Sequence, residues 1–316
     1  MLWIDILLLI VSVLVMIGAG TVLVRSLTKI ATFLKLSGFV IGFIIMAFAT
    51  SIPELFVGIT SAIAKTPALA LGTVIGANII DLTLVIGVAI ILSRGIKIES
   101  SKTKKDSLYM FGIASVAMVL TFLGNELSRI DGAILILLFF WYAKHLIREG
   151  HVFKQELENK IKRWEVVRSV ALFIIALVIL FYSASFVVGY AGDISFTLGV
   201  PPVLIGLLLI ALSTTLPELV FTTKAVRMGQ SSLALGDLIG SVVVNSTLVL
   251  GVTALIFPIS AHYLTFLVSA LFMITVAFIF ATYTSITKRL GWRVGTSLIL
   301  LYVLFLITEV YLRTIA

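Results

Sequence analysis

The chain has no cysteine, and among its 316 residues only three are histidine and only 12% are charged. The lack of cysteine excludes disulfide bonds, thiolate metal sites and cysteine nucleophiles. The histidines, His145, His151 and His262, fall in expected loops or segment ends and lack metal-ligand spacing. A soluble globular protein carries roughly 25% charged residues, whereas 60% of this chain is hydrophobic. The composition therefore excludes a soluble domain and predicts a polytopic membrane protein.

Apolar runs bounded by charged or turn residues predict ten membrane-spanning helices, so the expected fold class is an all-α polytopic membrane protein. The first run has no positive residue before it and is expected to be a span, not a cleaved signal peptide. The expected helices cover residues 3–24, 36–64, 68–92, 107–124, 129–147, 167–191, 199–226, 231–257, 263–284 and 295–313.

The net charge of +8 follows the expected topology and does not indicate a nucleic-acid partner. If the N-terminus lies outside, 20 of the 23 basic residues fall in cytoplasmic loops, and only Lys65, Arg129 and Arg313 fall outside. This excess predicts an integral protein of the cell membrane with both termini outside. The only long hydrophilic stretch, 148–166, is expected to be a cytoplasmic linker.

Residues 40–88 repeat as residues 204–252 without a gap, with 18 of the 49 positions identical. Both copies contain a Thr-x-x-Pro-Glu block and a Gly-x-x-x-Gly block. Because an odd number of spans, five, separates the copies, they cross the membrane in opposite directions. The sequence therefore predicts two inverted five-helix repeats, 1–147 and 167–316, joined by the linker 148–166. Such repeats are typical of secondary transporters, whose sites lie near the midplane between the repeats.

The first polar tier lies on the Pro-Glu helices. Its side chains recur at i, i+3, i+4 and i+7, so each copy places them on one helix face. The proline beside each glutamate frees a backbone carbonyl four residues earlier. The residues of this tier are Ala47, Thr50, Ser51 and Glu54, and in the second copy Ala211, Thr214, Thr215 and Glu218.

The second polar tier lies on the following helices. Its members recur at i, i+4 and i+8, and the glycine pairs of these helices predict close approach to the Pro-Glu helices. The i, i+4 relation of Asp237 to Ser241 suggests the cytoplasmic access path, and the role of Asp237 is left open. The members are Thr73, Ala77 and Asp81, matched in the second copy by Asp237, Ser241 and Asn245.

Glu54, Asp81 and Glu218 fall well inside predicted spans, with no Lys or Arg at comparable depth. A carboxylate at a helix centre costs roughly 2.5–3.5 kcal/mol, so the three are either protonated or compensated by a bound cation. Oxygen ligands without imidazole or thiolate favour Ca²⁺ or Na⁺, whereas Zn²⁺ or Cu⁺ prefers nitrogen or sulfur.

These blocks resemble the alpha repeats of the cation/Ca²⁺ antiporter superfamily, and most closely its prokaryotic sodium/calcium exchanger-like members. That family's pattern is approximately G-T-S-x-P-E followed by G-N-x-I-G-S-N-x-x-N/D. Here residues 49–54 read A-T-S-I-P-E and 72–81 read G-T-V-I-G-A-N-I-I-D. The second copy reads S-T-T-L-P-E at 213–218 and G-D-L-I-G-S-V-V-V-N at 236–245.

The resemblance implies an antiporter, not an enzyme, that exchanges Ca²⁺ for Na⁺ by alternating access. Its partners would be the two ions and the lipid bilayer, with no cofactor, nucleic acid or obligatory protein partner. It implies Glu54 and Glu218 as central Ca²⁺ ligands. The remaining residues that it implies for the Ca²⁺ and Na⁺ sites are Thr50, Thr214, Ser51, Thr215, Ser241, Asp81, Asn245 and the carbonyls of Ala47 and Ala211.

The chain departs from the family pattern at several positions. Ala77 replaces the usual serine and Thr215 replaces another serine, while Ala49 and Ser213 stand where glycines are usual. In addition, the carboxylate of the Asp81/Asn245 pair lies in the first repeat instead of the second. These changes leave open whether Na⁺ is the coupling ion.

Three alternatives remain at this point. Proton-coupled cation exchange is favoured by the lost hydroxyl at Ala77 and the carboxylate of Asp81. A cation channel could use the same cluster, but it has no need of an inverted repeat. An intramembrane hydrolase could use two buried glutamates as acid and base, but no nucleophile or metal motif accompanies them.

Overall fold

Helices make up most of the part of the chain that the structure describes. The computed structural model describes residues 2–33, 47–98, 101–150, 163–260 and 263–315. The elements of the first half are α1 (Leu2–Phe33), α2 (Ala47–Thr50), α3 (Ile52–Ile63), α4 (Ala68–Ile80), the π-helix η2 (Asp81–Val85), α5 (Ile86–Leu92), β1 (Ile96–Lys97), α6 (Ser101–Gly124), β2 (Glu126–Leu127) and α7 (Arg129–Gly150).

The second half repeats this order of elements, with α9 and η3 in addition. It comprises α8 (Arg163–Leu198), α9 (Pro202–Ile205), the π-helix η3 (Gly206–Ile210), α10 (Ala211–Thr214), α11 (Leu216–Arg227), α12 (Ser231–Val244), the π-helix η4 (Asn245–Val249), α13 (Leu250–Ile256), β3 (Ile259–Ser260), α14 (Tyr263–Ile286), β4 (Arg289–Leu290) and α15 (Trp292–Ile315).

The expected fold class is confirmed. Within the described ranges, nine helices are long and apolar enough to cross a membrane, and Ile52–Ile63 is a shorter apolar helix. The first part of the expected second span, residues 36–46, lies outside the described residues.

Several helices are longer than their apolar runs predict. α1 continues to Phe33 instead of residue 24, and α8 spans Arg163–Leu198 instead of 167–191. Because α7 continues to Gly150, helices enter the expected linker 148–166 from both sides. Long polar side chains keep their charged ends in water while their stems follow a helix out of the apolar layer. An apolar run therefore marks the hydrocarbon boundary, not the last helical residue.

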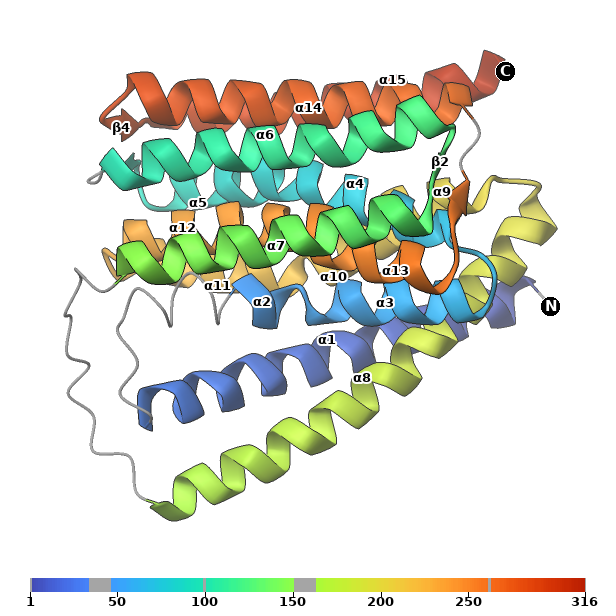
Figure 1. Cartoon of the computed structure of the whole chain (residues 1–316), viewed down its shortest axis with the longest axis horizontal. Coiled ribbons are helices and arrows are strands. Elements are labelled where there is room, and N and C mark those ends of the chain that lie inside the picture. Colours follow the sequence, from blue (N-terminus) through green and yellow to red (C-terminus); the bar gives the residue numbers. More distant parts are fainter. Residues whose placement is uncertain (1, 34–46, 99–100, 151–162, 261–262, 316) are drawn as a thin grey trace.

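The two halves run in opposite directions. In Figure 1, the chain passes from α2 to α3 toward the right, but from α10 to α11 toward the left. The following spans are reversed too, since α4 leads leftward to α5 while α12 leads rightward to α13. Both ends of the described chain lie at the right. The expected inverted repeat is therefore confirmed.

Two short antiparallel strand pairs join the halves at opposite ends of the bundle (Figure 1). β1 pairs with β4 in the register Ile96↔Leu290. β2 pairs with β3 in the register Leu127↔Ile259. Each pair thus connects a loop of the first repeat to a loop of the second.

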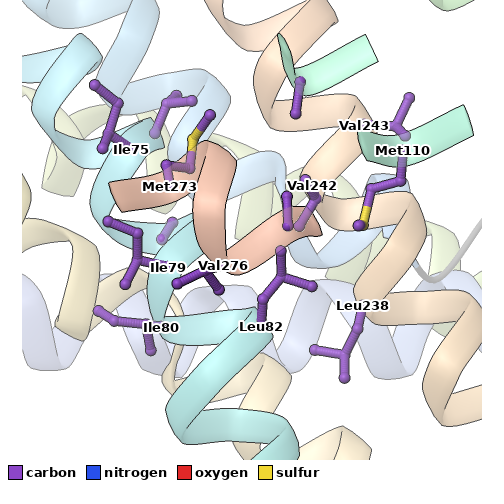
Figure 2. Close-up of a cluster of buried hydrophobic side chains, with 14 of the residues drawn as sticks. Ile75, Ile79, Ile80, Leu82, Met110, Leu238, Val242, Val243, Met273 and Val276 are labelled. Atoms are coloured by element: carbon purple, nitrogen blue, oxygen red, sulfur yellow. The ribbon is translucent and has the colours of Figure 1, made fainter. Parts of the chain in front are cut away.

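The central spans are α4–η2–α5 and α12–η4–α13. In their most apolar windows, 83% and 78% of the residues are buried, compared with 28% in α8 and α15. Figure 2 shows the apolar packing around them, with Ile79 of α4 near Met273 and Val276 of α14, and Met110 of α6 near Val243 of α12.

At one flank, α1 and α8 pack against each other (Figure 1). Met16, Leu23 and Val187 of this pair belong to a second apolar cluster, which also contains Ile52 and Ile210 of the two Pro-Glu spans.

Candidate cation-binding site

Each repeat interrupts one membrane helix next to its Pro-Glu block. Only Ser51 separates α2 from α3, and only Thr215 separates α10 from α11. Their backbones are nearly identical, with φ −82° and ψ 2° at Ser51 and φ −82° and ψ −2° at Thr215. These ψ values lie well away from the α-helical value of about −42°. Pro53 and Pro217 follow two residues later, where each lacks the N–H that would continue the hydrogen bonding.

The breaks place Glu54 and Glu218 in the first turns of α3 and α11. The first N–H groups of a helix have no partner within the helix, and its dipole favours negative charge there. A helix interrupted inside the membrane therefore provides a place for a carboxyl group that an unbroken helix lacks.

The last residue of the second tier in each repeat begins a π-helical turn. Asp81 is the first residue of η2 and Asn245 is the first residue of η4, so the two insertions occupy matched positions of the repeats. Short π-helical segments inside α-helices frequently occur at functional sites.

Four carboxyl groups from four different spans are buried together. Glu54, Asp81, Glu218 and Asp237 are each at most 1% exposed. Asp81 lies within electrostatic range of Glu54 and Asp237, and Glu218 lies within range of the other three. We call these four residues the carboxylate cluster.

Most oxygens of the carboxylate cluster have no hydrogen-bond partner among the described residues. They are both oxygens of Glu54, Asp81 and Glu218, and Oδ2 of Asp237. The hydroxyls of Thr214 and Ser241 lie beside Glu54 and Asp81 but outside ordinary hydrogen-bond geometry. No Lys or Arg whose exposure the structure describes is buried. Because buried polar groups are normally paired, these oxygens are available to a positively charged ligand.

Hydroxyl groups connect the two repeats around the cluster. The Thr50 hydroxyl donates to Oδ1 of Asp237 over 3.3 Å. The Ser51 and Ser241 hydroxyls are hydrogen-bonded at 3.1 Å. Both contacts join the broken helix of the first repeat to α12 of the second.

The carbonyls of Ala47 and Ala211 already accept hydrogen bonds. Ala47 accepts from the Ser51 N–H at 3.2 Å and from the Thr50 hydroxyl at 3.3 Å. Ala211 accepts from the Thr215 N–H at 3.1 Å and from the hydroxyls of Thr214 and Thr215 at 3.1 and 3.0 Å. A cation that uses these carbonyls therefore has to compete with hydroxyl hydrogens.

Within the described ranges, no three His, Asp or Glu side chains gather closely enough to hold one metal ion by themselves. A cation at this cluster would therefore depend on hydroxyl, amide and carbonyl oxygens as well as carboxylates. Ca²⁺ and Na⁺ accept such mixed sets of hard oxygen ligands, and Ca²⁺ takes roughly six to eight oxygens in a flexible geometry.

The structure buries every residue of the expected ligand set, although their role as ligands stays a prediction. None is more than 2% exposed: Ala47, Thr50, Ser51, Glu54, Asp81, Ala211, Thr214, Thr215, Glu218, Ser241 and Asn245.

Two residues of the site were not predicted as such. The role of Asp237 was left open, with the access path suggested by its i, i+4 relation to Ser241, and the structure buries it fully. Its match to Thr73, already in the polar tier, was the available signal. Asn78 also lies inside the site region, where it hydrogen-bonds Ser246 and Asn245. The second copy has Val242 at the position of Asn78, but the family pattern has Asn there, which was the available signal.

Glycines of α4 allow close contact between the repeats, as their spacing predicted. A Cβ at Gly72 would overlap the carbonyl oxygen of Val203 in α9. A Cβ at Gly76 would overlap the carbonyl of Leu207 and lie 2.6 Å from the Cβ of Ala211. The Asp81 span of the first repeat therefore packs directly against the Pro-Glu span of the second.

Known proteins are similar to this chain in both sequence and fold. The chain is 28% identical to sodium/calcium exchanger MaX1 of Methanosarcina acetivorans, with 99% of this chain and 100% of that protein covered. It is 30% identical to the putative antiporter CaxA of Alkalimonas amylolytica, covering 78% and 79% of the two chains.

Among solved structures, the sodium-calcium exchanger NCX_Mj soaked with Na⁺ and Sr²⁺ matches with a TM-score of 0.69. The two are 25% identical over 96% of this chain and 98% of that one. The sequence model of the family described as "Sodium/calcium exchanger protein" matches residues 4–148 and 168–311, which are nearly the two expected repeats. The resemblance seen in the motifs is therefore confirmed, and the chain belongs to the sodium/calcium exchanger protein family.

Proposed function

We propose that this chain exchanges Ca²⁺ for Na⁺ across the membrane by alternating access. The observation that carries the proposal is the carboxylate cluster, in which four buried acids from both repeats lack a basic partner among the described residues. The name of the relative MaX1 supports the choice of ions. The eleven buried residues of the expected set are proposed as the ligands, with Glu54 and Glu218 at the centre.

Coupling follows from the charge of the cluster. Buried carboxylates without a cation repel one another and cost desolvation energy, so closure over an empty cluster is unfavourable. Either one Ca²⁺ or several Na⁺ ions provide compensating charge. A protein that changes conformation only when its cluster is occupied must bind one kind of ion before it can return from releasing the other. The two kinds of ion therefore cross the membrane in opposite directions.

The proposed alternating units are the inverted repeats, residues 1–147 and 167–316, with a cytoplasmic linker at 148–166. Because the repeats run in opposite directions (Figure 1), exchanging their conformations turns an inward-open state into an outward-open one. Both termini are proposed to lie outside. The end of the bundle that carries Arg94, Lys97 and Arg289 is then cytoplasmic, in agreement with the positive-inside rule.

Transport in liposomes tests the proposal. The purified chain is reconstituted with Na⁺ inside, and Ca²⁺ uptake is followed after dilution into Na⁺-free buffer. We expect uptake that depends on the Na⁺ gradient and that is lost in Glu54→Gln and Glu218→Gln. The control Glu165→Gln changes an exposed glutamate at the start of α8 and should transport normally. Ca²⁺ uptake that is independent of the Na⁺ gradient would refute Na⁺ as the coupling ion.

Proton-coupled exchange is the second candidate. It is favoured by the number of carboxyl groups in the cluster and by Ala77, which provides no hydroxyl where the family usually has serine. The same liposomes with a pH gradient and no Na⁺ distinguish the two. Ca²⁺ uptake driven by that gradient alone would select proton coupling.

A further inference from the structure

Asp237 presents a carboxylate oxygen that the protein leaves unsatisfied. The residue lies in α12 and is fully buried. Its Oδ1 accepts the Thr50 hydroxyl over 3.3 Å, while Oδ2 is buried without a hydrogen-bond partner among the described residues. The carboxylate also lies within electrostatic range of Asp81 and Glu218. The unpaired oxygen therefore belongs to a carboxylate that lies near two other members of the carboxylate cluster.

The first repeat has no equivalent of this charge. The matched residue, Thr73, is buried too, but its hydroxyl donates to the Leu69 carbonyl of its own helix over 2.8 Å. Asp237 thus gives the cluster a fourth carboxylate, on the side where Thr50 lies.

Asp237 gives the Thr50 hydroxyl a second acceptor, because the Ala47 carbonyl lies at the same distance of 3.3 Å. A hydroxyl has one hydrogen and two lone pairs, and a carboxylate is a stronger acceptor than a carbonyl. When its single hydrogen is directed at Asp237, Thr50 no longer donates to the Ala47 carbonyl and can turn a lone pair toward a cation. Its counterpart, Thr214, donates to the matched carbonyl of Ala211 over 3.1 Å.

We propose that Asp237 is a further cation ligand, acting with the Thr50 hydroxyl, and that it makes the cluster favour a divalent over a monovalent cation. This inference rests on the proposed function, because it assumes that the cluster binds the exchanged ions.

The preference follows from Coulomb's law. At a given distance, a carboxylate attracts Ca²⁺ twice as strongly as Na⁺, because the energy scales with the product of the charges. Removing that charge therefore changes the logarithm of the Ca²⁺ affinity about twice as much as that of the Na⁺ affinity. The number of carboxylate ligands is also a main determinant of Ca²⁺ affinity in other sites.

The test is calorimetric binding of Ca²⁺ and Na⁺ to the purified full chain in detergent. Asp237→Asn keeps the shape of the side chain and removes its charge. We expect the Ca²⁺ dissociation constant to rise about tenfold and the half-saturating Na⁺ concentration to rise about threefold. Asp237→Thr introduces the residue found at the matched position of the first repeat. It should give the same ratio between the Ca²⁺ and Na⁺ fold-changes, so the test can still be made if one of the two variants folds poorly.

Asp193→Asn is the matched control, because Asp193 is an exposed aspartate of α8. It should leave both affinities unchanged. Equal fold-changes for both ions, or no change in either, would overturn the inference. If the unmodified chain binds neither ion, the proposed function itself fails. If that chain binds and exchanges both ions while Asp237→Asn binds them normally, only the role of Asp237 fails.

Discussion

Asn245 donates a hydrogen bond from its side-chain Nδ2 to the side-chain oxygen of Asn78 over 3.3 Å, and so joins the start of η4 to α4. Asn78 in turn donates to the hydroxyl of Ser246 over 2.9 Å. With its nitrogen engaged in this way, Asn245 keeps its Oδ1 buried and without a partner among the described residues. Asn78 therefore determines which end of the Asn245 amide is available as a ligand.

Replacing Asn78 should destabilise the protein through its partners. Asn78→Leu removes the acceptor of the Asn245 amide and the donor to Ser246, and an unsatisfied buried group costs about 1–3 kcal/mol. We expect a lower unfolding midpoint for the purified protein in ion-free detergent. Asn78→Leu combined with Asn245→Leu should cost less than the two single changes together. A fully stable Asn78→Leu variant would contradict the hydrogen-bonding scheme.

The glycine contact between the repeats predicts a clear difference between two similar substitutions. Gly72→Ala places a methyl group against the Val203 carbonyl, which belongs to the backbone and cannot rotate away. Overpacking of this kind typically costs about 1–3 kcal/mol. Gly189→Ala in α8 meets no atom within 4 Å and should be neutral or stabilising by about 0.5–1 kcal/mol. The measurement compares the thermal unfolding midpoints of the two variants. Equal shifts from the unmodified protein would show that the contact between Gly72 and Val203 is not tight.

The helix break in the second repeat should matter for transport more than for stability. Pro217→Ala restores an N–H that can hydrogen-bond the Ser213 carbonyl, which favours a continuous helix. We expect Na⁺-dependent Ca²⁺ uptake to fall about tenfold, corresponding to roughly 1.4 kcal/mol on the barrier, while the thermal midpoint is maintained or rises. Pro202→Ala, at the first position of α9, is the control, because an N–H there has no partner within the helix. Equal uptake by both variants would contradict a role for the break.

The proposed orientation can be measured because the chain has no cysteine of its own. Lys97→Cys in β1 and Arg129→Cys at the start of α7 replace exposed basic residues near opposite ends of the bundle. A membrane-impermeant thiol reagent added to intact cells should label Arg129→Cys, and should label Lys97→Cys only after permeabilisation. The reverse pattern would place the termini inside.

Most of the membrane architecture could be predicted from the sequence. Long apolar runs define the spans because the bilayer requires about 20 apolar residues per helix, and the repeat predicted their opposite directions. The burial of Glu54, Asp81 and Glu218 was predictable because the residues around them are apolar. Close packing at Gly72 and Gly76 was predictable from their spacing.

Other features depend on contacts between distant parts of the chain, which a local sequence pattern does not reveal. The π-helical turns at Asp81 and Asn245 add one residue to a helical turn without altering hydropathy. The strands at Ile96 and Leu290 comprise two residues each, too few for a periodic signal. The position of Asp237 beside Thr50 depends on a contact between the two repeats, which its i, i+4 relation to Ser241 does not reveal.

The pairing of Thr50 with Asp237 also has a consequence for biosynthesis, because 187 positions separate the two residues. When Thr50 leaves the ribosome, its partner has not been synthesised, and neither has β4, which pairs with β1. The first repeat must therefore remain in the bilayer as an incomplete half, with Glu54 and Asp81 still lacking the second repeat around them. Contacts of such long sequence separation form late in folding. The proposed cation-binding region is thus completed only after α12 enters the membrane, and a chain truncated before that helix lacks Asp237 and Ser241 as well as Asn245.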